Sequence, residues 1–175
     1  TSSIVADEDI TVSIATRGTG TEGTDYNTIS DITISAGATT GTASFTPIND
    51  TVFEANETAI VSISSVSGAD ATESGVQAET ITIVKDADAA PTVTLATSAT
   101  SIAENAGSSL TLTATLSNAT NEDVTVGIST SGTGTEGTDY GTISDITISA
   151  GSTTGTASFT PTDDNVFEGN ETGIV

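Results

Sequence analysis

The chain has 175 residues and a formal net charge of −22, with only two basic residues, Arg17 and Lys85. Nucleic acid and anionic membrane surfaces both attract positively charged proteins, so neither is an expected partner. The sequence contains no Cys and no His, which excludes disulfide bonds and Cys/His zinc sites.

Charged residues make up only 15% of the chain and β-branched residues are abundant, so the sequence predicts folded β-structure and not disorder. The length predicts one to two domains. No apolar run approaches the ~20 residues of a membrane span, and no signal peptide opens the sequence. We therefore expect no membrane insertion, and we expect Thr1 to lie inside a longer protein.

Apolar residues alternate with polar ones at period two, which is the pattern of strands with one buried face. In chain order these segments are residues 10–14, 32–34, 43–45, 61–63, 81–83, 93–95, 110–116 and 124–128. Turn formers separate them, and no segment shows a helical period of comparable quality. Short strands at this spacing predict an all-β, antiparallel sandwich of about seven strands.

An internal repeat organises the chain. Residues 18–26 and 132–140 both read GTGTEGTDY, and the same offset of 114 residues aligns 1–61 with 115–175 at 45 of 61 positions. This identity indicates a tandem duplication. Pro91 cannot donate to a β-ladder and marks the boundary. We predict one repeat at 1–88 that lacks its first strands, and a second at 89–175 that lacks its last strands.

Two acidic runs occupy equivalent positions in the two repeats. Their oxygen-bearing residues are Asn49, Asp50, Glu54 and Glu57 in the first, and Asp163, Asp164, Glu168 and Glu171 in the second. Carboxylates at this density resist ionising together unless a cation lies among them, and oxygen ligands suit Ca²⁺. The alternative is a solvated acidic turn after a strand, but the repetition of the spacing favours a metal site.

Further acids are expected at strand ends, namely Asp25, Asp86, Asp88, Glu104 and Asp139. Strand alternation alone does not establish that these loops converge. Asp25 and Asp139 could instead cap a turn through an Asx hydrogen bond. The neighbouring Tyr26 and Tyr140 are expected in the core, and Phe53 and Phe167 are expected to anchor the acidic runs to it.

Four segments together resemble the Calx-beta domain: residues 101–107 (SIAENAG), 137–140 (GTDY), 158–161 (SFTP) and 163–171 (DDNVFEGNE). The last is the most specific, and the resemblance covers essentially the whole chain in two incomplete copies. It implies tandem Greek-key, immunoglobulin-like β-sandwiches. Calx-beta domains are known as Ca²⁺ sensors in sodium/calcium exchangers and as tandem modules of large microbial surface proteins.

The resemblance also implies a set of Ca²⁺ ligands by position. In the second repeat these are Glu104, Asp139, Asp163, Asp164, Glu168 and Glu171. In the first repeat they are Asp25, Asn49, Asp50, Glu54 and Glu57, with Asp86 and Asp88 matching the acids at the domain exit. Asn49 stands where the family has Asp, which keeps an oxygen donor but removes one charge.

The expected function is a non-enzymatic, calcium-binding repeat module of an extracellular adhesin, stalk or filament protein at the cell surface. Ca²⁺ would stiffen the domain ends and junctions, and the partners would be adjacent repeats of the same chain or neighbouring chains in a filament. The alternative is a Ca²⁺-sensing regulatory domain of the exchanger type. A flat threonine array for surface binding is disfavoured by the twist of a sandwich. An enzyme is not expected, because no nucleophile–base arrangement or phosphate-binding loop is present.

Overall fold

The computed structural model describes residues 2, 4–85, 87–167 and 169–175. The described chain is all-β with antiparallel strand pairs, as the sequence predicts, and its helical content is one 3₁₀ turn at Glu104–Ala106. It divides into two compact units. The first comprises Thr1–Asp50 and Ala55–Ala87, and the second comprises Thr51–Glu54 and Asp88–Val175.

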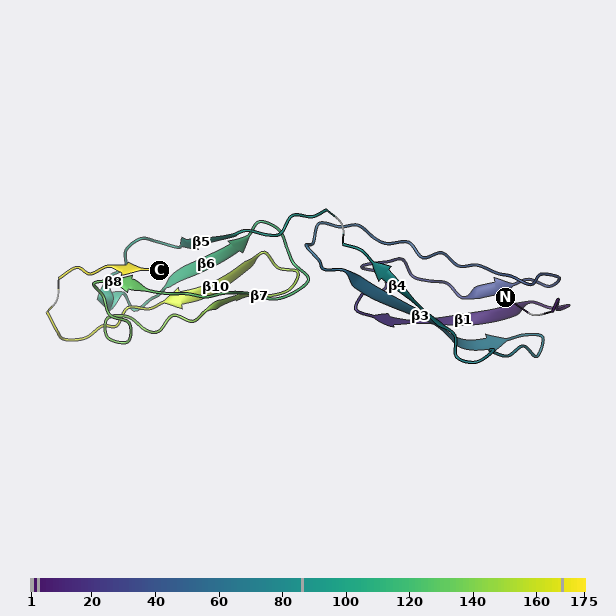
Figure 1. Ribbon diagram of the computed structural model, residues 1–175. Coiled ribbons are helices and arrows are strands. Elements are labelled where there is room, and N and C mark those ends of the chain that lie inside the picture. Colours follow the sequence, from purple (N-terminus) through teal and green to yellow (C-terminus); the bar gives the residue numbers. More distant parts are fainter. Residues whose placement is uncertain (1, 3, 86, 168) are drawn as a thin grey trace. The chain divides into compact units, whose positions relative to one another are not determined.

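The first unit is built on a four-stranded sheet (Figure 1). Its strands are β1 (Ile10–Gly18), β2 (Ile32–Ile34), β3 (Glu57–Ser67) and β4 (Ala78–Ile83), in the spatial order β2-β1-β3-β4. The alternating residues of these strands give one apolar face, on which Ile10, Ile34 and Ala59 are buried.

A β-bulge interrupts the pairing of β1 with β3 between Ser13 and Ile14. The Asp31 carboxylate stabilises the bulge: it accepts hydrogen bonds from the Ile14 amide (3.0 Å) and from the Ser13 hydroxyl (2.9 Å). In the second unit the Ile128 amide donates to Asp145 at 2.9 Å. These two aspartates therefore have a structural role in both repeats.

The second unit contains three smaller sheets, with the orders β10-β6-β5, β11-β8 and β7-β9. The strands are β5 (Val93–Thr97), β6 (Leu110–Leu116), β7 (Val124–Val126), β8 (Ser131–Gly132), β9 (Ile146–Ile148), β10 (Thr154–Phe159) and β11 (Gly173–Ile174). In the register of β10 with β6, Ala157 lies opposite Leu112 and Phe159 lies opposite Leu110.

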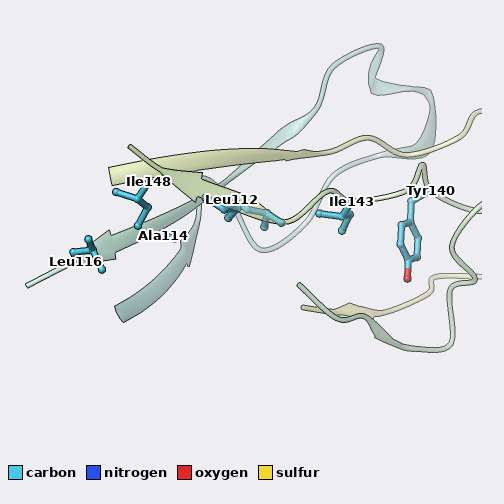
Figure 2. Packing of buried hydrophobic residues seen from close by; sticks show 7 residues of the cluster. Leu112, Ala114, Leu116, Tyr140, Ile143 and Ile148 are labelled. Carbon is cyan, nitrogen blue, oxygen red and sulfur yellow. The ribbon is translucent and has the colours of Figure 1, made fainter. Parts of the chain in front are cut away.

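The core of the second unit lies between β6 and β9 (Figure 2). Its buried members are Leu112, Ala114, Leu116, Tyr140, Ile143, Ile146 and Ile148. The buried residues of β6 follow the period-two pattern predicted for 110–116, and those of β9 repeat the pattern predicted for the equivalent residues 32–34. Full burial of one such aliphatic side chain stabilises a fold by roughly 1.5–3 kcal/mol, so this cluster is the main source of the unit's stability.

Two local predictions are wrong. Residues 43–45 form no strand, although the identical residues 157–159 belong to β10. The reason is pairing: β10 has β6 beside it, whereas residues 43–45 have no ladder partner in the described part of the first unit. Phe167, expected as an anchor, is fully exposed at 101%. Phe53 is half-buried, and its amide donates to the Ala119 carbonyl at 2.9 Å within the second unit.

Candidate metal centre

A tight turn positions the aspartate of each GTGTEGTDY segment. The Asp25 amide donates to the Thr21 carbonyl at 2.9 Å, and the Thr21 amide donates back to the Asp25 carboxylate. In the second unit the Thr135 amide donates to Asp139 at 2.6 Å. Asp25 and Asp139 therefore both cap a turn, which was one of the two roles expected from the sequence. This hydrogen bond uses one lone pair of a carboxylate that has two oxygens, so the other lone pairs are available to a metal ion.

A stacked aromatic pair holds this turn against the core. Tyr26 is 1% exposed, and its ring stacks on Phe45 with centroids 4.8 Å apart and planes at 23°. Tyr140 stacks on Phe159 at the same centroid distance, with planes at 27°. The expectation that both tyrosines are core residues is confirmed. Because each tyrosine directly follows its aspartate, the stack fixes where the carboxylate lies.

Two carboxylates of the first unit come together beside this turn. Asp25 and Glu57 each place a carboxylate oxygen within 4.8 Å of the other. Asp25 is 6% exposed, and Glu57 is half-buried. Two negative charges at this spacing repel each other, and partial burial strengthens the repulsion, because water screens them less than in open solvent. A divalent cation bound to oxygen ligands would remove that cost.

Small residues make room for the glutamates. A Cβ placed on Gly20 would lie 3.0 Å from Cδ1 of Ile83 and 3.3 Å from Oε2 of Glu57, and one placed on Gly134 would lie 3.2 Å from Oε2 of Glu171. Such contacts are tighter than most side chains accept. The two glycines therefore let the carboxylates approach the backbone of the GTGTEGTDY segment in both repeats. Sequence reasoning did not single them out, although their repetition at the 114-residue offset is a signal.

The corresponding region of the second unit is a cleft of about 750 Å³ whose lining includes Glu104, Asp139 and Glu171. Although Glu171 as a residue is exposed, partial desolvation of its carboxylate raises its pKa above the ordinary 4.5. The negative charge of Asp139, a hydrogen bond with Asp139 and the charge of Glu104 raise the pKa of Glu171 further. Three of the predicted ligands therefore interact electrostatically.

The remaining predicted ligands fall into three groups in the structure. Asp86 and Glu168 lie outside the described residues, and Glu168 is the counterpart of Glu54. Asp164 caps a local turn, since it accepts a hydrogen bond from the Val166 amide at 2.7 Å. The other five are exposed or half-buried; they are Asn49, Asp50, Glu54, Asp88 and Asp163. Their ligand role stays a prediction.

Other acids serve the backbone. The Ala36 amide donates to Asp9 at 2.8 Å, and the Ala150 amide donates to Asp123 at the same distance. Glu22 accepts hydrogen bonds from the Thr16 hydroxyl (2.6 Å) and from the Ile29 amide. These carboxylates stabilise turns, as Asp25 and Asp139 also do, but they are not among the predicted ligands.

Two features characterise this module: antiparallel β-structure, and carboxylates gathered at the ends of strands. The family model of the Calx-beta domain matches residues 2–88 and 86–175, so the chain belongs to the Calx-beta family and carries two such domains in tandem. Calx-beta domains are associated with Ca²⁺ binding, which agrees with the acidic cluster. No curated protein matches the chain. Within the described residues, no helix has the length and apolar character needed to span a membrane.

We predict that Glu171 makes the metal-free second unit less stable as pH rises. Its pKa is raised in the folded state, so its stabilising contribution is complete below the ordinary pKa of 4.5 and is lost as pH rises through the folded-state value. Glu171→Gln removes this dependence. Thermal unfolding in chelator between acidic and neutral pH measures it, as the difference between the wild-type chain and the variant.

Glu122→Gln is the matched control, because it removes the same charge from the same unit away from the cleft lining. An identical pH profile for wild type and Glu171→Gln would show that the Glu171 carboxylate has no unfavourable interactions in the folded unit.

Proposed function

We propose that this chain is a non-enzymatic, Ca²⁺-binding repeat module of an extracellular adhesin, stalk or filament protein. The observation that supports it most is the convergence of the Asp25 and Glu57 carboxylates in the first unit. Hard oxygen ligands without Cys or His favour Ca²⁺ or Mg²⁺ over transition metals. The ligands come from separate segments, and this suits the flexible coordination of Ca²⁺ better than the strict octahedron of Mg²⁺.

The role of the ion in this proposal is mechanical. Units of this size bury enough surface to fold alone, so Ca²⁺ acts on local order where loops meet and where one repeat passes into the next. Residues 84–91 join the repeats and include Asp86 and Asp88. Neutralising acids around such a junction restricts its bending. Near-identical repeats supply length and stiffness, which are properties of a stalk, and the adjacent repeats are its partners.

The affinity distinguishes this function from the exchanger-type sensor. An extracellular module works at Ca²⁺ dissociation constants of about 10⁻⁴–10⁻³ M, whereas sensors work at about 10⁻⁷–10⁻⁵ M. The proposal therefore predicts a Ca²⁺ dissociation constant in the weaker range. A micromolar constant would instead favour the sensor function.

Calcium titration by calorimetry tests the site. We expect saturable binding, and we expect Asp25→Asn to weaken binding at the first-repeat site by about tenfold or more, since it removes one of two neighbouring charges. The amide oxygen of Asn keeps an acceptor for the Thr21 amide, so the turn is retained. Glu79→Gln on β4 is the charge-matched control and should bind as wild type. Equal affinities for Asp25→Asn and Glu79→Gln would contradict the proposed site.

Chelation tests the mechanical role. We expect removal of Ca²⁺ to increase protease cleavage within residues 86–91 and to broaden the small-angle X-ray scattering distance distribution, because the junction becomes free to bend. Mg²⁺ at the same concentration serves as the ionic control. Scattering and cleavage that are unchanged between Ca²⁺ and chelator would mean that the ion does not stiffen the chain.

A further inference from the structure

We propose that the turn at residues 117–121 of the second unit, here called the receiving turn, is a docking surface for the apolar centre of the first acidic run, with Phe53 as the anchor. The occupant is Thr51–Glu54 of this chain. These four residues belong to the second compact unit, although Asp50 before them and Ala55 after them belong to the first. The inference concerns a contact between protein segments and does not depend on bound Ca²⁺.

Both backbone groups of Phe53 pair with the receiving turn. The Phe53 amide donates to the Ala119 carbonyl at 2.9 Å, and the Phe53 carbonyl accepts from the Asn121 amide at 3.4 Å. The two hydrogen bonds flank Thr120, so Phe53 and Thr120 form a parallel β-bridge. This is the smallest form of strand addition, in which main-chain bonds supply attachment and the side chain supplies specificity.

The receiving turn is ordered by contacts of its own. Thr120 is 7% exposed, and its hydroxyl donates to the Glu122 carbonyl at 2.6 Å. The Thr120 carbonyl accepts a hydrogen bond from the Gly151 amide at 2.7 Å, which ties the turn to the loop between β9 and β10. Because these bonds hold the turn independently of Phe53, docking has a low ordering cost.

The same turn holds the segment that leads into β5. The Asn118 side chain donates to the Ala89 carbonyl at 3.1 Å. The Ser117 amide donates to the Thr92 carbonyl at 3.0 Å, and the Thr92 amide donates back to the Ser117 hydroxyl at the same distance. Five consecutive residues therefore bind two separate stretches of chain, and this is what a fastening point between consecutive repeats requires.

The second acidic run provides an internal comparison for the anchor. Val52 and Phe53 are half-buried, whereas Val166 and Phe167 in the equivalent positions are 61% and 101% exposed. Both runs read Val-Phe-Glu, so the local preference is the same in both. The difference in burial therefore follows from what Phe53 contacts, and its backbone contacts the receiving turn.

The chemistry of this contact makes it independent of charge. The receiving turn reads SNATN and has no ionisable side chain, and the anchor is apolar. Salt and chelation act on charged groups, so neither should release the docked segment. The fastening would then persist without Ca²⁺, and Ca²⁺ would act on the acids that flank the anchor.

Amide hydrogen exchange tests the proposal by NMR on the full 175-residue chain in chelator. The Phe53 and Phe167 amides are a matched pair, because each follows a valine and has the same intrinsic exchange rate. We expect the Phe53 amide to exchange at least about tenfold more slowly, since it donates to the Ala119 carbonyl. This comparison uses the unaltered protein, so it does not depend on the folding of any variant.

Variants test the anchor itself. Phe53→Ala should speed exchange of the Asn121 amide by about tenfold or more, because loss of the ring weakens docking and frees this amide. Phe53→Leu should restore most of the protection. Phe167→Ala removes the same ring from an exposed position and should leave Asn121 unchanged. The Leu116 amide, which donates to Thr153 in the second unit, reports global folding and should be unaffected by all three.

Four results would overturn the proposal. Equal exchange of the Phe53 and Phe167 amides would show that residues 51–54 are not docked. An unchanged Asn121 amide in Phe53→Ala would show that the ring is not the anchor. Protection that appears only with Ca²⁺ would make docking a consequence of metal binding, and protection that grows with protein concentration would place the segment on a second copy of the chain. Failure to bind Ca²⁺ would contradict the proposed function and leave this inference standing.

Discussion

Repulsion among carboxylates at the ends of β-strands is the interaction that gives this structure its chemical character. The chain carries a net charge of −22, and the first unit brings the carboxylates of Asp25 and Glu57 within 4.8 Å of each other instead of dispersing them. The pKa of Glu171, raised by partial desolvation and by Asp139 and Glu104, shows the same conflict in the second unit. A bridging cation would resolve this conflict, and the proposed function rests on that argument.

The packing of uncharged residues holds these carboxylates close together. A buried tyrosine stacked on a phenylalanine fixes the turn that carries Asp25, and the glycine at position 20 leaves space for Glu57. Burial of aromatic surface supplies several kcal/mol in general, enough to hold acidic groups where their mutual repulsion would otherwise separate them. Because the second repeat has the same stack and an equivalent glycine, the arrangement belongs to the repeat and not to one copy.

The sequence predicts the all-β class well, because inward residues such as Leu112, Ala114 and Leu116 alternate strictly with threonines. The 114-residue repeat likewise predicts which residues of the two units are equivalent. Local pattern fails where the outcome depends on distant partners. Residues 43–45 have the same sequence as part of β10 but form no strand, since strand formation requires a neighbour with which to share hydrogen bonds. Phe167 is apolar but fully exposed for a related reason: burial needs a surface to pack on.

The candidate site could be predicted in part. The residue types and their spacing identify the acidic runs, and the family resemblance identifies the candidate ligands among them. Sequence alone does not separate ligand candidates from acids such as Asp31, whose carboxylate binds a bulge in β1. That distinction depends on bulges and turn geometry that bring together residues far apart in the chain.

Tyrosine-sensitised terbium luminescence tests the central claim most directly. The chain has two tyrosines and no Trp, and Tyr26 and Tyr140 directly follow Asp25 and Asp139. Tb³⁺ occupies Ca²⁺ sites of hard oxygen ligands and emits when an excited aromatic ring is near. The account predicts strong sensitised emission that Ca²⁺ displaces and that NaCl of equal ionic strength leaves in place. No sensitised emission, or emission lost equally to NaCl, would contradict a specific cation site among these carboxylates.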